Sequence, residues 1–296
     1  FSRIAVGDWV CLRIVPEHEV AQAVGIILRE NDIARWRGGS RGERQTLAAN
    51  VDLVLVVQPL GGGDGGAGLA RIARSALVAA DCHARIAVVL TKADRLDVEV
   101  IVRAVAGVRE LLGDGGPVVG TSVADVAREC ESRGEAARAL GASWGLDGVR
   151  ELVPKGTVSI VLGESGAGKS TVLNRILGYD VLKTGAVRGR DGAGRHTTVA
   201  RRMVRLPGGG VIVDEPGLRS LPLVGHERGL AALFPEGARV AQECRFRDCT
   251  HTHEPGCAVR RALFDGTCEK ARVDAWVALA AEMRTGASSL DPDVVL

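Results

Sequence analysis

Short apolar runs alternate along this chain with segments in which apolar residues recur every three or four positions. The runs are continuous rather than alternating, which is typical of strands that are buried on both faces of a sheet. They predict strands over residues 51–57, 86–90, 118–120, 158–162 and 211–213. Apolar residues at helical spacing predict a helix over residues 169–177. The Ala, Arg and Glu content of residues 125–140 predicts an additional surface helix, and two further helices are expected over residues 258–264 and 270–284. This succession of strands and helices predicts an α/β fold.

The N-terminal region has a different pattern. Residues 4–12 and 23–28 read as short strands with turns between them, which predicts part of a small β-barrel. Residues 35–44 are basic with interspersed glycine, and they form either a mobile loop that touches phosphate or a solvated linker. The glycine-rich residues 61–66 predict a flexible loop, and residues 288–296 predict a loose tail.

A glycine-rich segment stands between the strand expected at 158–162 and the helix expected at 169–177. Residues 163–171 read Gly-Glu-Ser-Gly-Ala-Gly-Lys-Ser-Thr, which fits the P-loop pattern G-x-x-x-x-G-K-[ST]. In such a loop, backbone N–H groups and a helix N-terminus converge on phosphate oxygens. We expect Lys169 to reach the β- and γ-phosphates and Ser170 to bind Mg²⁺. The other expected contacts come from Gly163, Ser165, Gly166, Gly168 and Thr171.

A second motif is expected to recognise the base of a bound nucleotide. Residues 91–94 are Thr-Lys-Ala-Asp and fit [NT]-K-x-D, with Thr91 where Asn is more usual. The Asp94 carboxylate is expected to accept the N1–H and exocyclic N–H of guanine, a pair of donors that adenine lacks, while Lys92 lays its methylene stem along the base. A backbone contact to the guanine O6 is expected from residues 121–123 or from residues 142–144. The first segment is favoured because it follows a strand.

The order of these motifs is unusual. In an ordinary GTPase the P-loop comes first and the base-reading motif last, whereas here Thr91 and Asp94 precede Gly163. The order therefore predicts a circularly permuted domain, which a fold tolerates where the chain ends lie close together at the surface. The permutation also brings the switch segments next to the C-terminal region, so that hydrolysis can move that region.

Residues 194–198, Gly-Arg-His-Thr-Thr, resemble a switch I segment. A hydroxyl of Thr197 or Thr198 would complete the Mg²⁺ shell and sense the γ-phosphate. The flanking arginines contact RNA phosphate or form a solvated strand face. They are Arg188, Arg190, Arg201, Arg202 and Arg205.

Residues 214–217, Asp-Glu-Pro-Gly, fit D-x-x-G at the end of a strand. Asp214 is expected to hold Mg²⁺ through water, and the Gly217 N–H to meet the γ-phosphate. Leu218 follows, where Ras-like enzymes carry the Gln that orients the attacking water, so intrinsic hydrolysis should be slow. Three readings stay open for His196: it positions the water as a catalytic residue, a bound partner completes the site instead, or it is a loop residue.

Four soft metal ligands lie close together late in the chain. Cys244, Cys249, His251 and Cys257 fall within loop-rich sequence and predict a closed, structural Zn²⁺ site of Cys₃His type. His253 competes with His251 for the fourth position. The remaining cysteines are too dispersed to belong to the site.

Composition excludes several classes of protein. The chain has 296 residues, 46% hydrophobic, which is enough for a sizeable core and two or three domains. Its net charge of +2 means that any nucleic-acid surface is local, and 3% aromatic content argues against a stacking platform for single-stranded RNA. We expect no membrane span and no leader, and the chain starts at Phe1, so residues are expected to be missing upstream. Seven cysteines that do not pair off favour a reducing, cytoplasmic compartment, and we expect a monomer.

Taken together, the motifs resemble the RsgA (YjeQ) family of ribosome small subunit-dependent GTPases. The resemblance spans nearly the whole chain. It rests on residues 6–8, 48–52, 91–94, 163–170, 194–198, 214–217, 244–257 and their order. It implies an OB-fold over residues 1–45, incomplete at its N-terminus, a circularly permuted P-loop GTPase domain over 46–224 and a zinc-binding helical domain over 225–296.

The resemblance also implies a function. Members of this family bind the small ribosomal (30S) subunit and its 16S rRNA late in subunit assembly, and the subunit stimulates their hydrolysis of GTP to GDP. Two residues depart from the family pattern: Glu164 stands where Gln is usual, and Glu215 where Thr or Ser is usual. Because carboxylates near phosphates repel nucleotide, both are expected to alter its affinity unless they point away or approach Mg²⁺.

Two other classes of protein compete with this interpretation. An ABC-type P-loop ATPase would use Gly163 to Ser170 as Walker A and Asp214 with Glu215 as Walker B, but no L-S-G-G-Q signature occurs and residues 91–94 would have no role. An RNA-binding scaffold that binds nucleotide without turnover would explain Leu218. A preference for GTP over ATP, and turnover in the presence of small subunits, would separate the three.

Overall fold

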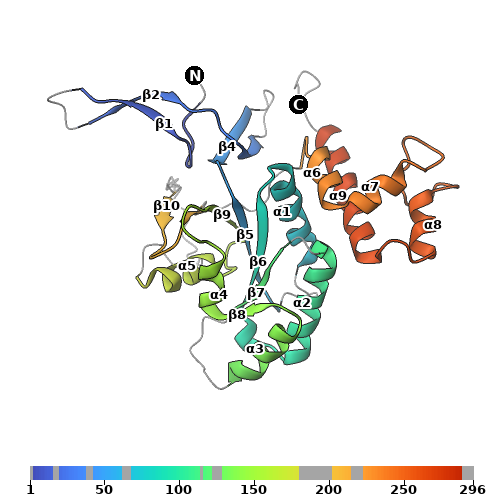
Figure 1. The fold of residues 1–296 in the computed structure, drawn as a ribbon. Helices are drawn as coiled ribbons and strands as arrows, with labels where there is room; N and C mark the ends of the chain where they lie inside the picture. Colours follow the sequence, from blue (N-terminus) through green and yellow to red (C-terminus); the bar gives the residue numbers. More distant parts are fainter. Residues whose placement is uncertain are drawn as a thin grey trace, which may run out of the picture.

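The computed structural model describes residues 3–15, 20–37, 43–61, 68–113, 116–121, 129–179, 202–214 and 223–288. A seven-stranded sheet forms the centre, in the order β10-β11-β9-β5-β6-β7-β8 (Figure 1). Its strands are β5 (Leu53–Pro59), β6 (Arg85–Thr91), β7 (Val118–Gly120), β8 (Ser143–Trp144), β9 (Val158–Leu162), β10 (Arg202–Arg205) and β11 (Val211–Asp214). All pairings are parallel except that of β10 with β11. The expected α/β class is confirmed.

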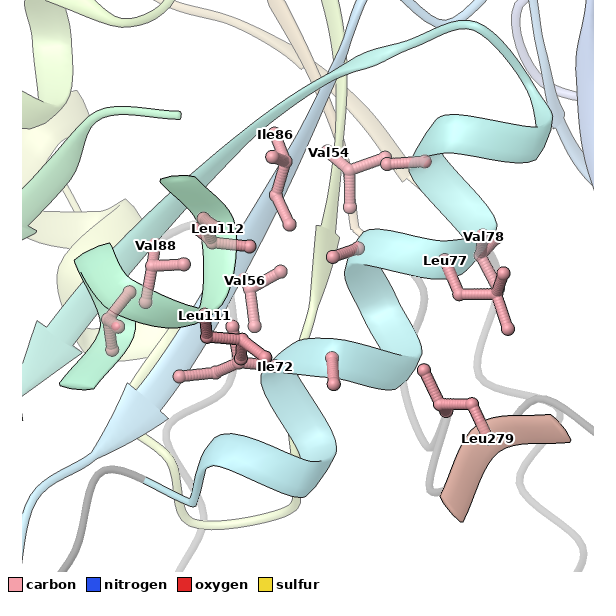
Figure 2. Packing of buried hydrophobic residues seen from close by; sticks show 14 of the residues in the cluster. Val54, Val56, Ile72, Leu77, Val78, Ile86, Val88, Leu111, Leu112 and Leu279 are labelled. Carbon is pink, nitrogen blue, oxygen red and sulfur yellow. The ribbon is translucent and has the colours of Figure 1, made fainter. Parts of the chain in front are cut away.

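Helices cover both faces of the sheet, which explains why its strands are continuous apolar runs. In β5, Val54 and Val56 belong to the core on one face, whereas Leu55 and Val57 belong to the core on the other. The first face packs against α1 (Leu69–Asp81) and α2 (Val98–Leu112), as Figure 2 shows, and α3 (Glu129–Ala139) packs on α2. The second face packs against α4 (Gly145–Glu151) and α5 (Lys169–Leu177).

The C-terminal helices pack onto α1 and α2. They are α6 (Glu227–Leu233), α7 (Pro235–Ala241), α8 (Ala258–Phe264) and α9 (Lys270–Ser288). Leu279 of α9 reaches toward Leu77 and Val78 of α1 (Figure 2), in the same core cluster. Burying this apolar surface holds the C-terminal helices against the sheet domain.

Partly buried polar contacts reinforce this junction. Arg272 of α9 donates to the carbonyl oxygens of Leu111 at 2.7 Å and Leu233 at 2.8 Å, and it pairs with Glu236. Asp81 of α1 accepts from His226 Nδ1 at 2.7 Å and from the Gly229 N–H at 3.0 Å. Since Arg272 joins α2, α6 and α7, it fixes the C-terminal helices to the sheet domain and to each other.

The N-terminal residues form two separate antiparallel pairs within the described part of the chain. β1 (Val10–Arg13) pairs with β2 (Gln22–Ile26), and β3 (Asp32–Arg37) pairs with β4 (Glu43–Ala49). Arg29, which lies between β2 and β3, forms an ion pair with Asp8 at 2.6 Å and donates to the hydroxyl of Thr46 in β4 at 2.9 Å, so it connects the two pairs. The prediction of short strands is confirmed, while the OB-fold stays a prediction.

One prediction about this region is wrong. Residues 35–37 and residues 43–44, expected in a loop, lie in β3 and β4 and pair in register. The reason is cross-strand pairing, because the buried Leu47 and Ala48 later in β4 anchor an extended segment that carries the basic residues with it. The charge and glycine content of this segment indicate a loop, whereas the pairing of its two strands is not visible in the local sequence.

Other boundaries differ by small amounts. The strands at 118–120 and 158–162 and the helices at 169–177 and 258–264 have the expected bounds, and the last helix extends to residue 288. The helix expected at 125–140 is described as α3 over 129–139, and residues 61–66 lie almost wholly outside the described residues. Among the helices that the structure describes, each is too short or too polar to cross a bilayer.

Candidate functional site

The expected nucleotide-binding segments meet at one edge of the sheet. In parallel strands the carboxyl ends lie at the same edge, and this is the usual ligand site of open α/β sheets. The register aligns Thr91 with Pro59, and Asp214 with Val161. The carboxyl ends of β6, β7, β9 and β11 therefore share this edge, although these strands come from distant parts of the chain.

The loop after β9 has a backbone that requires glycine. Gly163 has φ 152°, and a Cβ there would lie 2.3 Å from the carbonyl oxygen of Val57. Gly166 and Gly168 have φ 80° and 94°, and α5 begins directly after Gly168. These conformations suit glycine, and the space beside Gly166 is open, since a Cβ there would have no atom within 4 Å. The loop and the N-terminus of α5, which starts with Lys169, fit a phosphate group.

Lys169 lies over this loop. Its Nζ donates to the carbonyl oxygens of Gly163 at 2.5 Å and Glu164 at 2.7 Å. Burial lowers the pKa of Lys169 from its ordinary value, against the opposing charges of Asp214 and Glu164. Burial likewise raises the pKa of Asp214, which is 6% exposed, against the charges of Lys169 and Arg202. A half-buried cation and a buried carboxylate therefore lie within electrostatic reach of each other, and these are the charges that phosphate and Mg²⁺ require.

The base-reading segment is attached directly to the phosphate loop. The hydroxyl of Thr91 donates to the carbonyl oxygen of Ala167 at 2.6 Å, and Thr91 is 1% exposed. Lys92 adopts a left-handed conformation with φ 61°, and Asp94 follows in the short 3₁₀ helix η1 (Ala93–Arg95). The turn directs the chain away from β6 at the carboxyl edge. This contact brings the two motifs together in space despite their reversed order in the sequence.

Thr121 continues β7 at the same edge. Its N–H donates to the carbonyl oxygen of Leu90 at 2.9 Å, which extends the pairing of β7 with β6. Its side chain is 0% exposed, and its Oγ1 is buried without a hydrogen-bond partner among the described residues. The competing segment, with Ser143 and Trp144, forms β8 and pairs with β7. Residues 122 and 123 lie outside the described residues, so the choice between the segments stays a prediction.

Two threonine substitutions should have opposite effects on folding. Thr91→Val removes the donor to Ala167 and should lower the free energy of unfolding by about 1–3 kcal/mol, since the carbonyl loses this buried partner. Thr121→Val has the same shape change but removes a hydroxyl without a partner, so stability should stay unchanged or rise. Urea unfolding of both variants without nucleotide measures this. Equal losses would mean that the contact between Thr91 and Ala167 contributes nothing.

The four predicted metal ligands lie together between α7 and α8. The ligand atoms of Cys244, Cys249, His251 and Cys257 all lie within 4.8 Å of one another. Nδ1 of His251 is 3.6 Å from the sulfurs of both Cys244 and Cys257, which are 4.0 Å apart. A tetrahedral Zn²⁺ with bonds of about 2.3 Å to sulfur spaces its ligands at about 3.8 Å. The arrangement therefore fits such an ion.

Neighbouring residues hold this cluster in shape. The carboxylate of Glu254 accepts from Thr250 and from the N–H groups of residues 252 and 253, which keeps its pKa far below the ordinary value. The ring of His251 stacks on Trp276 of α9, with centroids 4.8 Å apart. His253 instead contacts Thr252 and lies outside the cluster. Of the two histidines, His251 is the one placed to bind a metal.

Some expected residues cannot be located. His196, Thr197, Thr198 and Gly217 lie outside the described residues, as does Glu215. One residue at the site is not predicted from the sequence. It is Arg71 of α1, whose Nε lies 2.8 Å from the Glu164 carboxylate. No motif marks this arginine, because its position depends on how α1 packs beside the loop.

Known proteins have sequences similar to that of this chain. A family model described as RsgA GTPase matches residues 26–224. The small ribosomal subunit biogenesis GTPase RsgA of Opitutus terrae is 41% identical over 299 residues, covering 97% of this chain and 75% of its own length. The protein of the same name from Streptomyces avermitilis is 38% identical, covering 92% of this chain and 68% of its own length.

Solved structures show the fold. The crystal structure of YjeQ from Thermotoga maritima superposes with a TM-score of 0.61 at 23% identity, covering 96% of this chain and 85% of that one. The structure of YloQ, described as a circularly permuted GTPase, gives a TM-score of 0.60 at 20% identity, covering 96% and 82%. The family match favours GTP hydrolysis over the ATPase and scaffold interpretations. The chain belongs to the RsgA GTPase family and is a GTP hydrolase.

Proposed function

We propose that this protein is a GTPase that acts on the small ribosomal subunit late in its assembly and hydrolyses GTP to GDP and phosphate, with stimulation by the subunit. The names of the curated relatives support the subunit as partner. The observation that carries the GTPase site is the hydrogen bond from Thr91 to Ala167, because it attaches the guanine-reading segment to the phosphate loop. Both segments then serve one nucleotide.

The phosphate side of the site follows from the loop geometry. Backbone N–H groups from Gly163 to Gly168 surround the phosphate oxygens, with side-chain contacts from Ser165 and Thr171. Lys169 exchanges its two carbonyl partners for β- and γ-phosphate oxygens. Ser170, at the start of α5, and Asp214, at the end of β11, would hold Mg²⁺. When bound, Mg²⁺ neutralises charge that develops on the phosphates.

The base side rests on Asp94. Its carboxylate accepts two hydrogen bonds from guanine, and Lys92 packs its stem along the base, while Thr91 holds the segment against the phosphate loop. The switch roles are carried by Thr197 or Thr198 and by the Gly217 N–H, which respond to the γ-phosphate. His196 positions the attacking water, because Leu218 has no hydrogen-bonding group for this task.

The flanking regions complete the proposal. Residues 1–45 belong to an OB-fold, residues 46–224 to the permuted GTPase domain, and residues 225–296 to a helical domain that one structural Zn²⁺ stabilises through Cys244, Cys249, His251 and Cys257. The partner includes 16S rRNA, and the protein works as a monomer in the cytoplasm. The packing of α9 on α1 and α2 gives the GTPase domain a direct mechanical connection to the zinc region.

One assay tests this function. Hydrolysis of GTP and ATP is measured with and without purified small ribosomal subunits, and we expect GTP turnover alone to rise sharply with the subunits. Asp94→Asn should lose the preference for GTP, because an amide cannot accept both guanine N–H groups. Asp147→Asn is a matched control, since this carboxylate of α4 is 85% exposed. Turnover that prefers ATP or is indifferent to subunits would refute the proposal.

A further inference from the structure

The phosphate loop contains a carboxylate that a nucleotide site would not be expected to tolerate. Glu164 is the second residue of the loop, next to Gly163. Its charge reaches the Lys169 ammonium, where it opposes the lowering of the lysine pKa by burial. A carboxylate in this position can interfere with nucleotide binding in two ways. It repels the phosphates, and it competes with them for Lys169.

The structure shows where this carboxylate goes. Oε1 of Glu164 lies 2.8 Å from Nε of Arg71, and the two side chains are 45% and 53% exposed. The pair joins the loop to the first turn of α1. Within the described part of the chain, Nζ of Lys169 donates to the backbone carbonyl oxygens of Gly163 and Glu164, so its contact with Glu164 is to the main chain, whereas the Glu164 carboxylate pairs with Arg71.

The position of Arg71 is set by the start of α1. Gly68, with φ 60°, precedes the helix, and a Cβ there would lie 2.6 Å from Nε2 of Gln58, a residue that is 4% exposed at the end of β5. The first turn of α1 is therefore anchored beside the carboxyl edge of the sheet. β5 is also the neighbour of β9, which leads into the loop. The backbone of Arg71 is thus placed near Glu164 by the packed start of α1, where its N–H also donates to the carbonyl oxygen of Gly68 at 3.0 Å.

We propose that Arg71 is a positioning residue for nucleotide binding: its guanidinium holds the Glu164 carboxylate outside the phosphate loop and offsets its charge, which leaves Lys169 available to the phosphates. The proposal rests on the proposed assignment of residues 163–171 as the phosphate-binding loop. It also explains how the chain accommodates Glu164 where the family usually has Gln.

The charge of an unpartnered Glu164 should affect the binding of GTP and GDP to different extents. GTP carries more negative charge than GDP, and its γ-phosphate adds charge within the loop's surroundings, so an unpartnered Glu164 should weaken GTP binding more than GDP binding. The folded state should be little affected, because an exposed ion pair contributes little to folding. Loss of nucleotide affinity without loss of stability is therefore the expected signature.

A double-mutant cycle tests the proposal. Arg71→Ala, Glu164→Gln and the double variant are compared with the parent chain, with Mg²⁺ present, for binding of GDP and a non-hydrolysable GTP analogue. Arg71→Ala should weaken the analogue by about fivefold to tenfold, and GDP by less, with the effect shrinking at high salt. In the Glu164→Gln background, removing Arg71 should change affinity by less than about twofold. Thermal unfolding of all four proteins should be nearly the same.

The outcomes separate this proposal from its alternatives. If Arg71→Ala weakens binding equally with and without Glu164, Arg71 contacts phosphate itself and the proposal is overturned. No change in the parent background also overturns it. Arg103→Ala, an exposed arginine of α2, is the matched control for loss of one positive charge. If the parent chain binds neither nucleotide, it is the proposed phosphate loop that fails.

Discussion

Replacing Lys169 by alanine should abolish measurable GTP hydrolysis. The Lys169 ammonium is held over the phosphate loop by two carbonyl oxygens and lies within electrostatic reach of Asp214, so it supplies positive charge where charge develops on the phosphates. Removing one such preorganised group lowers turnover by about a hundredfold to a thousandfold. Single-turnover hydrolysis in the presence of small ribosomal subunits measures the loss, and nucleotide binding should weaken as well.

Two measurements accompany this variant. Lys155→Ala removes an exposed lysine before β9, at the opposite edge of the sheet, and should leave turnover unchanged. The zinc content of Lys169→Ala should equal that of the parent chain, because the metal cluster lies in residues 244–257 and shares no residue with the loop. Turnover within tenfold of the parent would place the phosphates elsewhere. A loss of zinc would show that the two regions do not fold independently.

Substitution of Cys257 by alanine should remove the bound zinc and disorder the segment between α7 and α8. The Cys257 sulfur lies among the four ligand atoms and also accepts the N–H of Arg260 at 3.5 Å, which caps α8. Structural zinc sites contribute about 10–16 kcal/mol of apparent binding free energy, so losing one ligand removes more than the cap. We expect the zinc content to fall from about one to near zero and the unfolding temperature to drop.

The two nearby histidines sharpen this test. His251→Ala should lose zinc as Cys257→Ala does, because Nδ1 of His251 lies 3.6 Å from two of the sulfurs. His253→Ala should keep it, because His253 contacts Thr252 instead. Cys11→Ala, an exposed cysteine outside the cluster, serves as the control for loss of a thiol. Full zinc content in His251→Ala would assign the fourth position to another residue.

Local features of the chain were predicted well because their geometry is encoded by neighbours in sequence. The strand β9, the glycine-rich loop and the helix α5 have the expected bounds, since each depends on residues within a few positions. The four Cys and His residues also come together, because they fall within one short stretch. Gly163 is also part of the local P-loop pattern, and the backbone at this position has no room for a Cβ.

Contacts between distant segments were not predicted. Residues 35–37 and 43–44, which include three arginines, form strands because β3 and β4 pair with each other, and composition alone pointed to a loop. The ion pair of Arg71 with Glu164 and the contacts of Arg272 likewise depend on helices that pack from elsewhere in the chain. Such contacts arise only when apolar faces are buried together, so no local pattern marks them.

The sequence by itself therefore determined which chemistry this protein is expected to carry: a phosphate-binding loop, a guanine-reading segment, a set of soft metal ligands, and the motif order of a permuted domain. The tertiary structure alone decided how these parts are joined. In the tertiary structure, Thr91 donates a hydrogen bond to Ala167, Glu164 pairs with Arg71, and Arg272 of α9 donates a hydrogen bond to Leu111 of α2. The physical reason is that motifs are fixed by local backbone and residue type, whereas their relative positions are fixed by the packing of the sheet and its helices.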